Sequence, residues 1–243
     1  MEKMLQAMMK RFPLFIAMGV MVVMIALIIG AINAGAAADY YAIDKVTRDT
    51  SVELAQLRAR IESTIIWLPY LKFLGVAMIL AGITMALGVI SLRLQDLGKQ
   101  VMVSVPDKAR IPIPPKPATV YLMRMFMMLG MLIIIVGFVV SLNVAGVAAT
   151  VFSNPITAID AAPAGSALLT GLASVHAAEA WLEAFKFVGV AFFFLGIVNG
   201  LAAIIFALRY QQTAIPQVAQ NLTAPAAAPA APTAQPVTSS ARA

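Results

Sequence analysis

Few side chains in this sequence are suited to covalent or metal chemistry. The chain has no cysteine and one histidine, His176, which excludes thiol nucleophiles, disulfides, iron–sulfur clusters and Cys/His zinc sites. Glu179 follows His176 by three residues, a spacing that allows a proton-transfer pair or a weak metal site, although a hydrogen-bonded structural histidine is the simpler interpretation. Catalytic triads, phosphate-binding glycine loops and dinucleotide motifs are absent from the sequence. We expect a non-enzyme with no catalytic residues, no metal and no cofactor.

Methionine is the one abundant soft ligand, with 15 copies. Thioethers bind Cu(I), so copper handling is one hypothesis for the function. Alternate residues of a helix point to different faces, which favours core filling and adaptable packing instead. The two methionine clusters are Met1, Met4, Met8 and Met9, and Met123, Met125, Met127, Met128 and Met131.

Two lysines lie within apolar stretches, Lys72 and Lys186, each five residues after a tryptophan, Trp67 or Trp181. A charge inside a membrane span marks a functional site by default. The alternative is that both lysines reach back to the lipid headgroups while the tryptophans mark the membrane interface. Glu183 lies three residues before Lys186 and can pair with it.

Lys72 has no acidic residue at a comparable helical spacing. We therefore hypothesise that Lys72 meets Glu183 or Glu179 from another helix.

Glycines recur at a spacing of seven residues, close to two helical turns, in three apolar stretches. Such a spacing puts both glycines of a pair on one helix face and lets another backbone approach closely. These faces serve either packing within the chain or docking onto other subunits. The pairs are Gly75 and Gly82, Gly130 and Gly137, and Gly189 and Gly196, with Gly200 completing a GxxxG motif beside Asn199.

The composition requires these residues to be positioned in a lipid bilayer. The chain is 61% hydrophobic and 12% charged, with a mean hydropathy of +0.91, whereas a soluble domain carries about 25% charge. Four apolar stretches exceed the roughly 20 residues that cross a bilayer as a helix, at about 14–37, 67–92, 120–149 and 181–208. Strands of a barrel would be shorter and would alternate in polarity, so the predicted fold class is an all-α integral membrane protein with four transmembrane helices.

Self-comparison reveals an internal repeat. Residues 67–77 (WLPYLKFLGVA) and 181–191 (WLEAFKFVGVA) share seven of eleven positions at an offset of 114, and the first and third stretches align more weakly at an offset of 111, which pairs Gly19 with Gly130. A unit of two spans returns to its starting side, so the repeats must be parallel and related by an axis along the membrane normal. The sequence predicts two tandem parallel helical-hairpin repeats.

The expected domain organisation follows from this repeat. Residues 1–104 form the first hairpin, with an extracytoplasmic helical arm at about 50–66 capped by Thr50 or Ser51. Residues 105–119 form a proline-rich cytoplasmic connection, and residues 120–213 form the second hairpin. The Ala/Pro-rich segment 214–243 is expected to be a disordered cytoplasmic tail.

Basic residues set the orientation. The amino-terminal flank, the whole connection between the second and third spans together with Arg124 at the start of the third, and the region after the fourth span carry a net charge of +8, and the opposite side carries −2. The positive-inside rule places both termini in the cytoplasm and accounts for the net charge of +6 without nucleic acid. A cleavable signal peptide is the alternative for the first span, but its apolar core is longer than such peptides use.

The sequence favours a non-catalytic accessory or structural subunit of a larger membrane complex. Its expected partners are the lipid bilayer and other membrane subunits or further copies of itself, and its expected location is a bacterial inner membrane. The alternative is a small oligomeric channel or transporter in which Asn33, Asn143, Asn199 and Thr84 line a path.

Overall fold

The structure, a computed structural model, describes residues 11–112, 114–115 and 117–223. Within these residues it is helical, with no strand, which confirms the predicted all-α class. Four of its helices, α2, α4, α5 and α7, are long and apolar enough to cross a membrane. In chain order the helices are α2 (Phe12–Tyr41), α3 (Lys45–Thr50), α4 (Val52–Ser104), the 3₁₀ turn η1 (Asp107–Ala109), α5 (Ala118–Phe152), α6 (Ile156–Asp160) and α7 (Ala167–Thr223).

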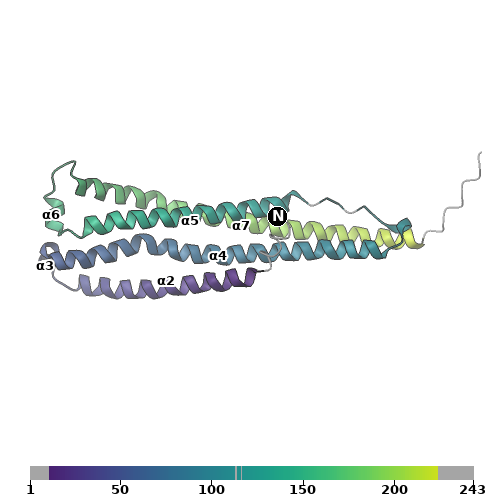
Figure 1. Cartoon of the computed structure of the whole chain (residues 1–243), viewed down its shortest axis with the longest axis horizontal. Helices are drawn as coiled ribbons and strands as arrows, with labels where there is room; N and C mark the ends of the chain where they lie inside the picture. The colour runs from purple at the N-terminus through teal and green to yellow at the C-terminus, as the bar shows by residue number, and fades with distance from the viewer. Residues whose placement is uncertain (1–10, 113, 116, 224–243) are drawn as a thin grey trace, which may run out of the picture.

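The long helices form two antiparallel hairpins that point the same way (Figure 1). Helix α2 packs against α4, and α5 packs against α7. Helix α4 also contacts both α5 and α7, whereas α2 lies at the edge of the bundle and has extensive contact with α4 alone. Helices α4 and α7 therefore run parallel to each other and join the two hairpins.

Local sequence explains where the helices start. The side chain of Ser51 accepts a hydrogen bond from the Leu54 backbone N–H at 3.4 Å and caps α4, and Asp44 caps α3 through the Thr47 N–H at 2.9 Å. Such caps satisfy backbone donors that have no partner inside the helix. Pro117 and Pro155 stand immediately before α5 and α6, where the fixed proline backbone suits a helix start.

Helix α4 contains both the expected arm and the span that follows it. The expected arm at 50–66 and the expected span at 67–92 form one continuous helix that runs through Pro69 to Ser104. A proline is tolerated in a long helix when neighbouring helices and side chains stabilise the interrupted turn. The arm of α4 therefore lies in line with its membrane-spanning segment.

The tail differs from the sequence-based expectation. Helix α7 continues to Thr223, ten residues into the segment expected to be disordered from Ala214. Ala214 and Val218 are buried against Met102 of α4, so this part of the Ala/Pro-rich segment gains a packing partner that composition alone does not reveal. Residues 224–243, the rest of the expected tail, lie outside the described residues.

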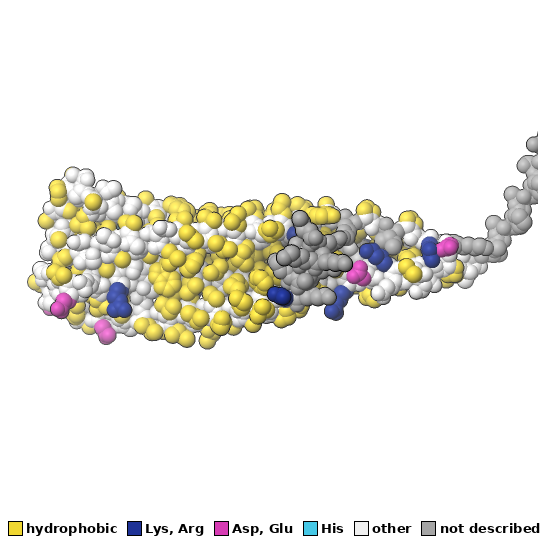
Figure 2. All heavy atoms as spheres, in the orientation of Figure 1, with side chains coloured by type: hydrophobic (Ala, Val, Ile, Leu, Met, Phe, Trp, Pro, Cys, Tyr) yellow, Lys and Arg dark blue, Asp and Glu magenta, His cyan; other side chains and the backbone are white. Residues whose placement is uncertain are grey.

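Apolar side chains cover a broad middle zone of the molecule (Figure 2). The core inside this zone is built largely from small residues and a few large ones, such as Ala77, Ala81, Ile134 and Phe193. Outside it, many large apolar side chains remain exposed, as expected for a surface that faces lipid. We take the apolar stretches, 67–92 in the case of α4, as the membrane-spanning segments.

Candidate interaction surfaces

Glycines form the crossing point of each hairpin. A Cβ atom added to Gly19 of α2 would lie 2.6 Å from the Gly75 carbonyl oxygen of α4, and one added to Gly75 would lie 2.8 Å from the Gly19 oxygen. In the second hairpin, a Cβ at Gly130 of α5 would lie 2.9 Å from the Gly189 oxygen of α7. Real Cβ atoms do not approach backbone oxygens so closely, so only glycine permits these crossings.

The remaining glycines of the predicted packing set also face helices of the same chain. Gly82 lies against Ile16 and the Phe12 carbonyl, Gly196 lies near the Met123 carbonyl, and Gly200 lies against Met123 and Leu87. Gly137 faces the ring of Tyr70. All seven glycines of the predicted packing set therefore face helices of the same chain.

Tyr70 joins the two hairpins and was not among the residues singled out from the sequence. Its side chain is 2% exposed, and its hydroxyl donates a hydrogen bond of 2.5 Å to the Leu182 carbonyl of α7. Ala184, which follows Tyr70 by the sequence offset of 114, is exposed. A tyrosine at position 70 and a small alanine 114 residues later form the sequence difference that could have pointed to this contact.

The two lysines behave differently. Lys186 pairs with Glu183 at 3.3 Å, and its ammonium group lies 5.4 Å from the centre of the Phe73 ring on α4. Lys72 instead points toward α2, where its Nζ would lie 3.8 Å from a Cβ at Gly30. The hypothesis that Lys72 meets Glu183 or Glu179 is wrong in this structure, because Lys72 projects from the face of α4 that α2 covers.

The tryptophans also lie in different surroundings. Trp67 packs against the cluster that joins α4, α5 and α7 at the arm end. Trp181 is half-exposed and stacks edge to face on Phe185 of its own helix. Trp67 is therefore partly buried in the bundle, whereas Trp181 is exposed.

Charged groups of the two arms meet beside the membrane-spanning segments. Burial raises the pKa of Glu62 above its ordinary value, the nearby Glu179 carboxylate of α7 adds to this shift, and Arg58 opposes it. The Arg58 guanidinium lies 4.6 Å from the centre of the Phe152 ring. His176 lies 3.7 Å from Glu179 and both are well exposed. Among the described residues no group of three or more His, Asp or Glu side chains is placed to hold a metal ion.

The methionines of α5 do not converge on one point. Met123 is buried beneath Gly200, whereas Met125 and Met128 are exposed. Several of these side chains line a wide apolar groove between α2, α4 and α5, together with Phe15, Ala81 and Met85. Met1, Met4, Met8 and Met9 lie outside the described residues.

The polar residues suggested for a transport path lie in separate places. Asn143 is exposed and Asn199 is partly exposed, and the side chain of each donates a hydrogen bond to a carbonyl of its own helix, that of Val139 and that of Leu195. Thr84 is buried between α4 and α7 and bonds the Leu80 carbonyl, and Asn33 bonds the Ile61 carbonyl at 3.5 Å. These four residues do not line a common path.

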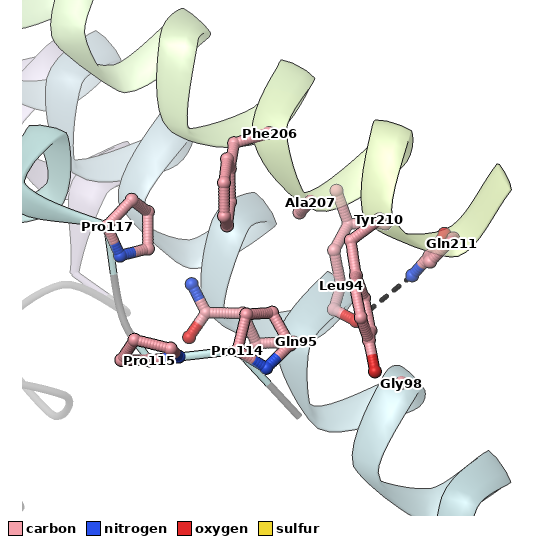
Figure 3. Close-up of a pocket in the computed structure, with 10 residues that line it drawn as sticks. All are labelled: Leu94, Gln95, Gly98, Pro114, Pro115, Pro117, Phe206, Ala207, Tyr210 and Gln211. Carbon is pink, nitrogen blue, oxygen red and sulfur yellow. Dashed lines mark hydrogen bonds between the residues drawn. The ribbon is translucent and has the colours of Figure 1, made fainter. Parts of the chain in front are cut away.

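At the end opposite the arms, α4 and α7 continue past the ends of α2 and α5 (Figure 1). We call residues 93–104 and 209–223 the stalk, and residues 105–117 the strap. Tyr210 of the stalk donates a hydrogen bond of 3.1 Å to the Pro112 carbonyl of the strap, and Gln211 donates one of 3.2 Å to the Leu94 carbonyl of α4. Prolines of the strap lie over Phe206, Tyr210 and Gln95 in Figure 3.

The stalk also exposes large apolar side chains on the basic side of the molecule. Val103 is 74% exposed and Ile215 is 65% exposed, and Leu97, Val101 and Leu222 are more than half exposed. These five side chains lie on two helices, α4 and α7.

Comparison with protein-family models, with curated proteins and with solved structures gives no match.

Proposed function

We propose that the chain is a non-catalytic accessory or structural subunit of a larger assembly in a bacterial inner membrane, with both termini in the cytoplasm. The observation that carries this proposal is the stalk. It is held by the strap and by its own packing, and it presents apolar side chains such as Val103 and Ile215 beyond the membrane-spanning segments. Ordered apolar surface of this kind is stabilised by contact with another protein.

The proposed orientation rests on the charge of the stalk side. The described basic residues at that side would lie in the cytoplasm by the positive-inside rule. Figure 2 displays Lys and Arg side chains around the stalk end. The basic residues of this side that lie within the described residues are Arg11, Arg93, Lys99, Lys108, Arg110, Arg124 and Arg209, while Lys3, Lys10, Lys116 and Arg242 lie outside them.

We also propose that the chain is a tandem duplication of one hairpin. The contacts at the two crossings support this, because they recur at the sequence offsets of 111 and 114. Gly75 lies against Val23 and Gly19 against Ile79, and the equivalent residues make the equivalent contacts in the second hairpin. There, Gly189 lies against Ile134 and Gly130 against Phe193.

Purification from native membranes tests the subunit proposal. We expect the tagged chain, extracted in mild detergent, to retain other polypeptides at fixed stoichiometry. Val103→Glu places a charge on the stalk and should remove these polypeptides without changing the thermal stability of the chain. Val46→Glu is the matched control, because Val46 is 75% exposed at the opposite end of the molecule, in α3.

Other outcomes of the same purification would overturn the proposal. A chain that purifies only with copies of itself and conducts solute in liposomes would be a channel or transporter. Stoichiometric copper in the purified chain would instead indicate copper handling.

A further inference from the structure

The second hairpin covers the face of α4 that carries Ala77, Ala81 and Met85, and Phe12 and Phe15 of α2 pack at the border of this face. Ala77, Ala81 and Met85 are at most 4% exposed there, and they pack with Ile134 of α5 and Phe193 of α7. This interface between the hairpins is distinct from the glycine crossings within each hairpin. The interface shows how the small and apolar side chains of this α4 face pack against a neighbouring hairpin.

The equivalent face of α7 is uncovered. At the offset of 114, the residues that match Ala77, Ala81 and Met85 are Ala191, Leu195 and Asn199; Ala191 and Leu195 are exposed, and Asn199 is partly exposed. The residues that match Tyr70 and Thr84 are likewise exposed in α7: Ala184 and Val198. Helix α7 therefore presents, on the side away from α5, the surface that α4 buries.

Two features of this α7 face suit a protein neighbour better than lipid. Asn199 lies within the apolar stretch 181–208, and its amide bonds only the Leu195 carbonyl of its own helix among the described residues. An asparagine amide has further donor and acceptor capacity, which hydrocarbon cannot satisfy and a second helix can. Ala184 and Ala191 on the same face allow a neighbouring backbone to approach closely.

The surface complementary to this face is also exposed, on α2. Met131 and Phe138 of α5 pack into the clusters that join the second hairpin to α4. Their equivalents at the offset of 111 are Val20 and Leu27, which are 48% and 51% exposed. One copy of the chain thus carries both halves of a contact that it already makes once internally.

We infer that the α7 face of one copy binds the α2–α4 hairpin of a second copy, repeating between chains the contact that joins the two hairpins within a chain. The contact is head-to-tail, because the two faces differ, and it leads to rings or open arrays. The inference rests on the duplication proposed above and does not require a partner at the stalk.

Cross-linking tests the inference directly, because the natural chain has no cysteine. Leu195→Cys places a thiol on the α7 face, and Val20→Cys places one on the α2 face. In the purified chain in lipid nanodiscs or mild detergent, a short bismaleimide should convert the double variant into dimers and longer ladders. Each single variant should stay monomeric, because neither face binds itself.

Two controls separate specific from random contact. Val139→Cys lies on α5 and Val139 is 51% exposed, so its combination with Val20→Cys should give no ladder. Adding Ala184→Phe to the cross-linking pair should lower the ladder yield by about tenfold while the thermal unfolding of the uncross-linked chain stays the same.

The result is separable from the subunit proposal. Failure of the double variant to form a ladder, or dimers from either single variant, would overturn the head-to-tail contact. Co-purifying polypeptides that depend on Val103 would leave the subunit proposal standing in that case. A ladder without any such polypeptide would support the contact and remove the stalk partner.

Discussion

At the scale of single residues, Gly130 and Gly146 of α5 give a direct test of the crossing. A Cβ at Gly130 would meet the Gly189 carbonyl and the Phe193 ring at 2.9 and 3.0 Å, whereas one at Gly146 would meet nothing within 4 Å. We expect Gly130→Ala to destabilise the chain by about 1–3 kcal/mol because the helices must separate. Gly146→Ala should be neutral or stabilising by up to about 1 kcal/mol.

Thermal or denaturant unfolding in detergent measures both glycine variants. Gly75→Ala should resemble Gly130→Ala, since its Cβ would lie 2.7 Å from Val23. Equal stability of Gly130→Ala and Gly146→Ala would contradict the close crossing.

Glu62 provides a prediction about pH. Burial and the nearby Glu179 raise the pKa of Glu62 in the folded chain, so ionisation of this carboxyl opposes folding. Stability should fall as pH rises from the ordinary value of 4.5 to the raised folded value, and should then stay level with respect to this group. Glu62→Gln removes the ionisation, so this variant should be more stable than the natural chain above that window.

The pH dependence of thermal unfolding checks this prediction. The advantage of Glu62→Gln should shrink as the pH falls below the window, and exposed Glu53 of the same arm supplies the control Glu53→Gln. A variant with the same stability difference at every pH would contradict the assigned cause.

The spacing of the glycines and lysines was visible in the sequence, but the neighbours of these residues were not. Glycine spacing and the lysine–tryptophan pattern are visible as local regularities, because they follow the helical period. Which helix a residue faces depends on the rotation of one helix against another, so the direction of Lys72 toward Gly30 could not be read from spacing. Tyr70 was missed for the same reason, since its partner lies 112 residues away.

At the scale of elements, the stalk depends on a small apolar contact. Val218 is 8% exposed and packs with Met102 and Ala214, close to the strap. Val218→Asp would bury a charge and should open the stalk. The strap is held by Tyr210 of the stalk. Trypsin should therefore cleave the Val218→Asp variant after the exposed Arg110 about tenfold faster than it cleaves the natural chain.

The neighbouring residue supplies the matched control for this experiment. Gln217 is exposed on the same turn of α7, so Gln217→Asp should leave the rate of cleavage at Arg110 unchanged. Equal acceleration by both substitutions would indicate a general effect of charge on α7 and would contradict the packing role of Val218.

Element boundaries were predictable where caps and apolar length set them, as at Ser51. They were not predictable where packing overrides composition. The segment after Ala214 has the composition of a disordered tail, yet alanine also favours helix, and burial against Met102 decides between the two. Pro216 lies inside α7 for the same reason, since the surrounding helix is held in place by contacts with α4.

At the scale of the whole molecule, the apolar zone lies between an arm end and a stalk end that differ in charge and shape. Four helices long enough to cross a membrane were predictable from the length of the apolar stretches. The edge position of α2 does not follow, because two equivalent hairpins could meet in several ways. In the structure α4 contacts both α5 and α7, and this arrangement leaves α2 at the edge.

Orientation in the membrane is the final prediction and uses the cysteine-free background. Val46 in α3 and Val103 in the stalk are 75% and 74% exposed, at opposite ends of the molecule. If the basic stalk is cytoplasmic, an impermeant thiol reagent added to intact cells should label Val46→Cys and not Val103→Cys. Permeabilised cells should give equal labelling, which controls for reactivity. The reverse pattern would contradict the orientation, and labelling of both in intact cells would contradict a membrane crossing by α4, which lies between these residues in the chain.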